Sequence, residues 1–144
     1  MRINACIASR GRSHDLREIV THTLAMAKLP DTKVVVALDD DDSTAIAAFQ
    51  GYPDEVIVSV APREDSLGAK YNRAAAAYDA DLYVLLADDM QIVTPGWDRK
   101  FEEASQQIAD GIFCIYFVNT PWPSHMKAAY AVSRKLVDMM GFFM

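Results

Sequence analysis

The stretch LYVLLADDM, at residues 82–90, decides the fold, because an apolar run ends there in two adjacent carboxylates, Asp88 and Asp89. An apolar run without polar alternation is typical of a strand that is buried on both faces, as in a parallel sheet. Thr94 and Pro95 follow, and this pair favours a helix start, since Thr is a good N-cap and Pro suits the first helical position. The stretch therefore predicts a strand, a short loop and a helix, with carboxylates at the carboxyl end of the strand.

The two carboxylates lie where open α/β sheets bind their ligands, just beyond the end of a strand. Asp88 and Asp89 repel each other unless a cation lies between them. Mg²⁺ and Mn²⁺ prefer oxygen ligands, and Mg²⁺ usually takes one or two carboxylates together with phosphate and water. The pair predicts a metal–diphosphate site, although two acidic residues that simply open a solvated loop would give the same pattern.

Apolar runs of strand length alternate with helical patterns along the whole chain. The predicted strands cover residues 3–8, 33–38, 55–60, 82–87, 112–118 and 128–132. The segments between the first five have apolar residues at helical spacing or helix caps, and they are long enough for crossover connections. The sequence therefore predicts a single α/β domain over residues 1–144, with a mostly parallel central sheet flanked by helices.

The composition indicates a globular protein and argues against two kinds of partner. The 144 residues are 51% hydrophobic and 24% charged, and the formal net charge is -6. A negative net charge disfavours nucleic acid, whose phosphates require a basic surface. No apolar run reaches the roughly 20 residues needed to cross a bilayer, and no signal peptide opens the chain, so we expect a cytoplasmic protein without a membrane span.

Charged residues follow three of the predicted strands. Arg10 and Arg12 come after the first strand, residues 39–42 are four aspartates after the second, and residues 88–89 follow the fourth. These strand ends lie along one edge of a parallel sheet, and they meet if the strand order reverses beside the first strand. Carboxylates can bind ribose hydroxyls and a metal, while an arginine can neutralise phosphate oxygens. The pattern predicts a nucleotide diphosphate site, or, for Asp41 and Asp42, only a solvated turn and a helix cap.

The sequence resembles the nucleotide-sugar-binding half of GT-A glycosyltransferases, especially the family 2-like group. The segments that carry the resemblance are ASRGR at 8–12, LDD at 38–40, GAKYN at 68–72, ADD at 87–89 and TPGWD at 94–98. ADD falls at the position of the family's DXD motif but lacks its first acidic residue. The resemblance covers essentially the whole chain, and it implies a Rossmann-like nucleotide-diphospho-sugar transferase fold.

The resemblance also implies roles for individual residues, with a UDP- or GDP-sugar as the donor. Ser9 and Arg10 would line the base and ribose pocket, and Asp39 would form a hydrogen bond with the base or the ribose. Asp88 would contact the ribose or the sugar, and Asp89 would hold the Mn²⁺ or Mg²⁺ that bridges the diphosphate. The predicted donor-binding residues are Ser9, Arg10, Arg12, Asp39, Lys70, Asn72 and Asp88, and the predicted metal ligands are Asp89 and Asp88.

The implied reaction is metal-dependent glycosyl transfer, in which the metal stabilises the leaving nucleoside diphosphate while an acceptor hydroxyl attacks the anomeric carbon. The family's catalytic base belongs to an acceptor-binding half that would lie beyond Met144, so we expect a transferase truncated before that half. A non-catalytic nucleotide-sugar-binding or assembly module is the alternative, because the base is missing. A nucleotidyltransferase is a further alternative, although residues 9–12 contain little glycine for a triphosphate loop.

The last six residues, MMGFFM at 139–144, are unusually apolar for a terminus. An apolar end of this kind either packs on the core or remains exposed and forms a contact with a second copy. The sequence therefore also predicts a homodimer through this segment, as one of two possibilities.

Overall fold

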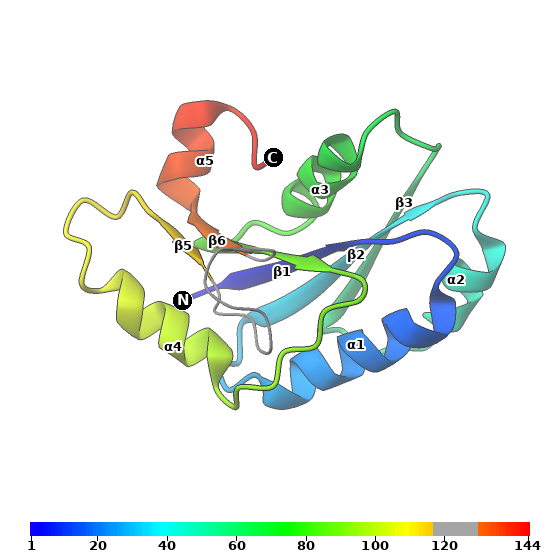
Figure 1. Ribbon diagram of the computed structural model, residues 1–144, viewed down its shortest axis with the longest axis horizontal. Coiled ribbons are helices and arrows are strands. Elements are labelled where there is room, and N and C mark those ends of the chain that lie inside the picture. Colours follow the sequence, from blue (N-terminus) through cyan, green and yellow to red (C-terminus); the bar gives the residue numbers. More distant parts are fainter. Residues whose placement is uncertain (117–129) are drawn as a thin grey trace.

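The structure is a computed structural model that describes residues 1–116 and 130–144. It confirms the predicted α/β class, with a six-stranded sheet and helices on both of its faces (Figure 1). The strands are β1 (Ile3–Ala8), β2 (Thr32–Asp39), β3 (Val56–Ala61), β4 (Leu82–Ala87), β5 (Cys114–Tyr116) and β6 (Tyr130–Ser133). The helices are α1 (Ser13–Met26), α2 (Ser43–Ala48), α3 (Leu67–Ala76), α4 (Trp97–Ser105) and α5 (Arg134–Met140). Within this described part, no helix has both the length and the apolar character needed to span a membrane.

The sheet has the strand order β3-β2-β1-β4-β6-β5. Strands β1 to β4 are parallel, β6 runs antiparallel to β4, and β5 runs antiparallel to β6. The chain places β2 and β3 on one side of β1 and then returns to place β4 on the other side. The order therefore reverses beside β1, which is the condition for the three charged segments to meet at one edge.

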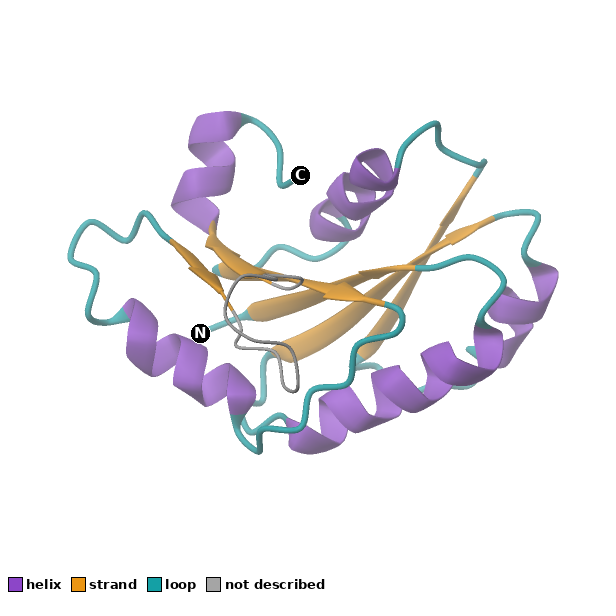
Figure 2. Cartoon of the chain, in the orientation of Figure 1, coloured by secondary structure: helices purple, strands orange, loops and turns teal. Residues whose placement is uncertain are grey.

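The central strands are buried on both faces, as their unbroken apolar sequences predict. Helices α1, α2 and α4 cover one face, and α3 and α5 cover the other (Figure 2). Neighbouring residues of one strand therefore enter different cores: Ile7 packs on the side of α1, and Cys6 packs on the side of α3. This arrangement fixes the strands rigidly and leaves their carboxyl ends free to carry polar side chains.

The start of α4 differs from the prediction that Thr94 caps the helix and Pro95 opens it. The helix begins at Trp97, and Gly96 is the N-cap in the left-handed region, with φ of 66°. A residue with a side chain is strained there, so glycine suits the position. The Gly96 amide donates to the carbonyl of Met26 at 2.7 Å, which ties the start of α4 to the end of α1.

Candidate functional site

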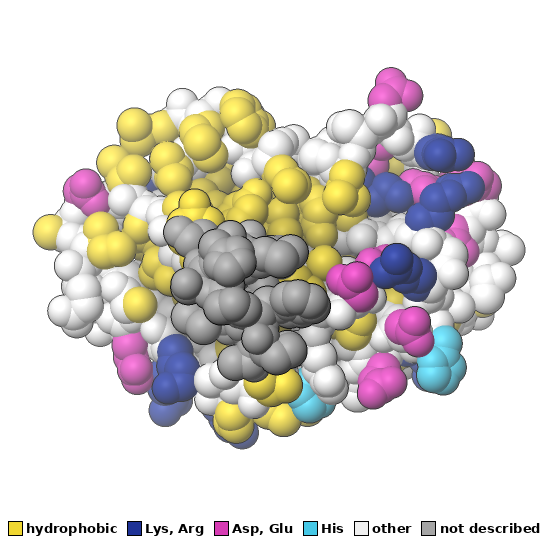
Figure 3. Space-filling model, in the orientation of Figure 1, with side chains coloured by type: hydrophobic (Ala, Val, Ile, Leu, Met, Phe, Trp, Pro, Cys, Tyr) yellow, Lys and Arg dark blue, Asp and Glu magenta, His cyan; other side chains and the backbone are white. Residues whose placement is uncertain are grey.

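The sheet brings the polar segments after β1, β2 and β4 to one edge. Ala8, the last residue of β1, lies opposite Ala37 in β2 and Ala87 in β4. Ser9, Asp39 and Asp88 therefore leave their strands within two residues of this common level. We call the group formed by residues 9–12, 39–42, 88–89 and Lys70 the polar edge. Side chains of both charges gather in this region of the surface (Figure 3).

Asp39 is the most deeply buried carboxylate of the polar edge, with its side chain 1% exposed. Lys70 of α3 places its Nζ 2.6 Å from Asp39 Oδ1, and Arg10 Nη1 donates to Asp39 Oδ2 at 2.7 Å. Burial alone would raise the pKa of Asp39, but the hydrogen bonds and charges of Lys70 and Arg10 outweigh it, so the pKa is lowered. Asp39 is therefore held as a carboxylate between two cations.

The loops that follow β1 and β2 are joined by further contacts. Arg10 forms a fork with Asp41, through Nη1 at 2.6 Å and Nη2 at 2.8 Å. These hydrogen bonds lower the pKa of Asp41 and raise the pKa of Arg10. Asp42 accepts from the Gly11 amide at 2.7 Å with one oxygen and from the Ala45 amide with the other, so it also caps α2. The cap expected at Asp42 is confirmed, and Asp41 lies in an exposed turn as expected, where it also forms the ion pair with Arg10.

Asp88 and Asp89 lie beside the loop after β1. The Ser9 hydroxyl donates to Asp88 Oδ2 at 2.7 Å, and Arg12 Nη1 donates to Asp88 Oδ1 at 3.1 Å. The same Arg12 nitrogen is 3.5 Å from Asp89 Oδ2. The Asp88 side chain is 17% exposed and the Asp89 side chain is 68% exposed, so Asp89 presents its oxygens to solvent.

Four consecutive residues of α3 reach four different parts of the molecule. Lys70 binds Asp39, and the Tyr71 hydroxyl donates to the carbonyl of Leu86 at 2.7 Å. Asn72 donates to the carbonyl of Met144 and accepts from the amides of residues 143 and 144. Arg73 donates to the carbonyls of residues 38 and 59, in β2 and β3, and to the carboxylate of residue 64. Lys70 therefore belongs to the polar edge, whereas Asn72 holds the end of the chain and is not brought to it.

The donor set of the polar edge fits a hard divalent cation that takes most of its ligands from phosphate. Among residues 1–116 and 130–144, no three His, Cys, Asp or Glu side chains are arranged to hold a metal ion. Asp88 and Asp89 supply two carboxylates from adjacent residues, and Mg²⁺ commonly needs no more than that when phosphate is present. A guanidinium nitrogen already lies against both carboxylates, so the pair attracts a cation.

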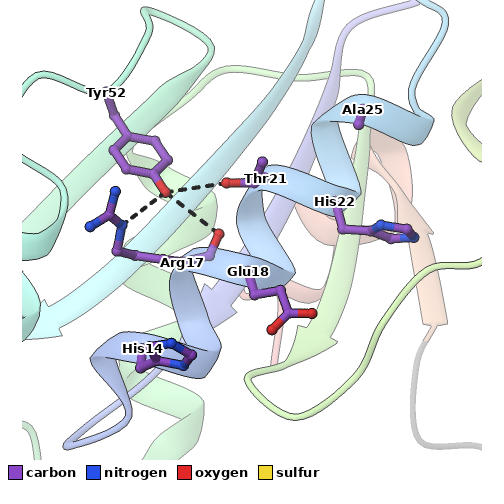
Figure 4. Close-up of a pocket in the computed structure, with 7 residues that line it drawn as sticks. All are labelled: His14, Arg17, Glu18, Thr21, His22, Ala25 and Tyr52. Atoms are coloured by element: carbon purple, nitrogen blue, oxygen red, sulfur yellow. Dashed lines mark hydrogen bonds between the residues drawn. The ribbon is translucent and has the colours of Figure 1, made fainter.

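A separate hollow of about 470 Å³ lies against α1 (Figure 4). The Tyr52 hydroxyl lies 3.2 Å from Thr21 Oγ1 and 3.4 Å from Arg17 Nε, and it closes one side of this hollow. The lining residues are His14, Arg17, Glu18, Thr21, His22, Ala25 and Tyr52. None of them is a predicted site residue, so this hollow is distinct from the polar edge.

One important polar residue was missed by sequence reasoning. Asp98 is completely buried at the start of α4, and its carboxylate accepts from the amides of Lys28, Leu29 and Arg99 and from the hydroxyl of Thr32. The segment TPGWD at residues 94–98 is one of those that carry the family resemblance. It gave no indication that Asp98 holds the turn between α1 and β2. Its partners are mainly backbone groups, which leave no pattern in a sequence.

No protein-family model matches the sequence, and neither does any curated protein. Solved structures do match its fold. The mannosyltransferase PcManGT from Pyrobaculum calidifontis, in complex with GDP-Man and Mn²⁺, aligns with a TM-score of 0.73 at 14% identity. The alignment covers 99% of this chain and 47% of that one. TarS 1-349 from S. aureus, in complex with UDP-GlcNAc, aligns with a TM-score of 0.64 at 14% identity, over 100% of this chain and 49% of that one.

A third match is a 4-diphosphocytidyl-2C-methyl-D-erythritol synthase from Anaerococcus prevotii, with a TM-score of 0.66 at 10% identity. The alignment covers 96% of this chain and 73% of the synthase chain. The matches to PcManGT and TarS confirm the predicted GT-A-type nucleotide-diphospho-sugar transferase fold, and the synthase aligns with the same sheet and helices. This chain spans about half the length of the two glycosyltransferase chains described above.

Proposed function

We propose that this chain binds a nucleotide-diphospho-sugar and a divalent cation at the polar edge, and that it is the donor-binding part of a glycosyltransferase. The observation that carries the proposal is the reversal of strand order beside β1, which gathers Ser9, Asp39 and Asp88 at one edge with two arginines and a lysine. Two solved structures of the same fold carry a GDP-sugar with Mn²⁺ or a UDP-sugar. Both the fold and the charge pattern support this function.

In the proposed complex, residues 9 and 10 line the base and ribose pocket. Asp39 accepts a hydrogen bond from the base or the ribose, and Lys70 holds that carboxylate in place. Arg10 covers Asp39 in this structure, and its own side chain is 42% exposed. Binding of the base therefore requires Arg10 to turn away from Asp39 into solvent or toward the nucleotide.

At the other end of the polar edge, Asp89, with Asp88, would hold Mn²⁺ or Mg²⁺, and Arg12 would neutralise phosphate oxygens. When bound, the cation would stabilise the charge that develops on the leaving nucleoside diphosphate. Ser9 orients Asp88 through the hydrogen bond at 2.7 Å. In the proposed complex, Asp88 would contact the ribose or the sugar from that position. We assign no residue of this chain as the catalytic base.

Donor binding without transfer is the second candidate function. Hydrolysis of, or transfer from, a nucleotide sugar separates the two candidates, because a pure binding module shows neither. Nucleotidyl transfer is a third candidate function, because a diphosphocytidyl synthase has the same fold. Tighter binding of nucleoside triphosphates than of diphosphates to this chain would favour it.

The direct test of the proposed site is ligand-induced stabilisation. A nucleoside diphosphate at about a hundred times its dissociation constant should add roughly 2.7 kcal/mol to the free energy of unfolding. For a domain of this size, the melting temperature should rise by about 6–10 °C. UDP, GDP, dTDP and CDP should be compared, each with and without Mn²⁺. The proposal fails if none of them raises the melting temperature.

We expect the Asp89→Asn substitution to remove the Mn²⁺-dependent part of this rise. The side chain is 68% exposed on a loop, so the variant should melt at the temperature of the parent without ligands. Asp65→Asn is the matched control, because Asp65 is an exposed aspartate in the loop before α3. If Asp89→Asn responds to the diphosphate and Mn²⁺ as the parent does, Asp89 is not a metal ligand.

Self-association through the C-terminal segment stays a prediction, as does a cytoplasmic location. Phe143 is buried on the core, but Met139, Met140, Phe142 and Met144 are 70%, 39%, 53% and 42% exposed. We expect a weak dimer that the Phe142→Ser substitution disrupts, because it removes an exposed aromatic side chain from this surface. Sedimentation velocity over a range of concentrations measures the effect. A parent that remains monomeric throughout that range would contradict the prediction.

A further inference from the structure

The clearest unassigned feature of the polar edge is the position of Arg12 between two carboxylates. Its Nη1 atom is 3.1 Å from Asp88 Oδ1 and 3.5 Å from Asp89 Oδ2. Asp88 is further held by the Ser9 hydroxyl on its other oxygen. One guanidinium nitrogen thus offsets the repulsion between the charges of two adjacent residues.

A divalent cation and this guanidinium cannot occupy the same place. Mg²⁺ and Ca²⁺ bind carboxylate oxygens at about 2.0–2.6 Å, which is closer than Arg12 approaches them here. A cation that bridges Asp88 and Asp89 would therefore have to displace Arg12 and lose part of its binding free energy in doing so. The Arg12 side chain is 50% exposed and has a long flexible stem, so it can leave without disturbing the fold.

We propose that Arg12 is an internal counterion, which occupies the Asp88–Asp89 pair until a divalent cation and a nucleoside diphosphate arrive together. The proposal rests on the proposed function for the identity of the anion, because a diphosphate gives the displaced guanidinium a new partner in fork geometry. The cation alone competes with Arg12, whereas the cation with a diphosphate does not. Arg12 thereby makes binding of the two ligands cooperative.

The first measurement is a titration of the protein with Mn²⁺ alone. The concentration of free Mn²⁺ is measured by electron paramagnetic resonance. Exposed ion pairs contribute little individually, so we expect Arg12→Gln to bind Mn²⁺ about three- to fivefold more tightly than the parent. Arg99→Gln is the matched control, since Arg99 is an exposed arginine on α4, and it should bind Mn²⁺ as the parent does. The double variant Arg12→Gln/Asp89→Asn should bind Mn²⁺ no more tightly than the parent, because it lacks one of the two carboxylates.

The second measurement repeats the titration with UDP and with GDP present. The diphosphate should increase the Mn²⁺ affinity of the parent more than it increases the Mn²⁺ affinity of Arg12→Gln. The reason is that the variant has no guanidinium that can move from the carboxylates to the phosphates. Equal Mn²⁺ affinity of Arg12→Gln and the parent would overturn the counterion role, even if the diphosphates bind. A gain that persists in the double variant would overturn it too, since the ion would then bind elsewhere.

The two proposals can fail separately. If Arg12→Gln gains Mn²⁺ affinity through Asp89 but neither protein binds a nucleoside diphosphate, the competition stands and the proposed function fails. If the diphosphates bind with Mn²⁺ but Arg12→Gln shows no gain, the proposed function stands and the counterion role fails.

Discussion

Replacing Asp98 with alanine should lower the free energy of unfolding by about 3–4 kcal/mol, one of the largest effects that we expect from a single substitution in this chain. The carboxylate is fully buried and accepts from Lys28 N at 2.9 and 2.8 Å, from Leu29 N at 2.7 Å and from Thr32 Oγ1 at 2.9 Å. Alanine would leave these donors without their acceptor, and it would release the link between α4 and the turn before β2. Urea unfolding monitored by circular dichroism measures the loss.

Two further variants make this prediction specific. Asp98→Asn keeps one oxygen acceptor, so it should lose less stability than Asp98→Ala. Asp65→Ala removes an exposed aspartate and should change the free energy of unfolding by less than about 0.5 kcal/mol. A loss below about 1 kcal/mol for Asp98→Ala would mean that the turn between α1 and β2 does not depend on this carboxylate.

The second large effect concerns the buried pair of Asp39 and Lys70. We expect Asp39→Asn to lower the free energy of unfolding by about 3–5 kcal/mol, because it leaves the Lys70 ammonium, 9% exposed, without its carboxylate. The double variant Asp39→Asn/Lys70→Met removes both charges and should lose less than Asp39→Asn alone. Urea unfolding of the parent, both single variants and the double variant completes the cycle. A double variant that is less stable than Asp39→Asn would contradict the prediction.

The pH dependence of stability gives an independent check on the same pair. The folded state lowers the pKa of Asp39 from its ordinary value of 3.8, so the carboxylate stabilises the fold above that value. This stabilisation is lost as the pH falls below about 4 and through the lowered pKa of the folded state. Asp39→Asn lacks the ionisable group, so its stability should fall less steeply with pH in that range than the stability of the parent.

Much of the sheet was predictable, because buried parallel strands have unbroken apolar sequences. The strand expected at residues 82–87 is observed at Leu82–Ala87, and β1 is observed at the expected residues 3–8. The directions of β5 and β6 were not predictable, because either direction produces the same apolar pattern. The strand expected at 112–118 is observed only as Cys114–Tyr116, with residues 117 and 118 outside the described part of the chain.

The sequence predicted that the charged segments after the strands converge, provided that the strand order reverses beside the first strand. The structure has this reversal beside β1. The pairing within the polar edge was not predictable, because Arg10 lies near several aspartates and any of them is a suitable partner. Arg10 binds Asp39 and Asp41 in this structure, and its expected role toward a nucleotide stays a prediction. Asn72 lies on α3 as expected, and its side chain accepts a hydrogen bond from the backbone amide of Phe143, 71 residues away along the chain. A backbone partner leaves no pattern in the sequence, so this contact was not predictable.

The four successive contacts of α3 also bear on how this helix can change during evolution. An ordinary surface helix tolerates substitution on its outer side, so its constrained positions recur every three or four residues. Residues 70–73 leave no such freedom, because consecutive side chains point in different directions and each of them has a partner elsewhere in the molecule. One turn of helix thus joins the polar edge, the end of β4, the C-terminal segment and the strands β2 and β3. Within this turn a change at any position gives up a separate connection, and the two residues that follow it, Ala74 and Ala75, are buried in the core.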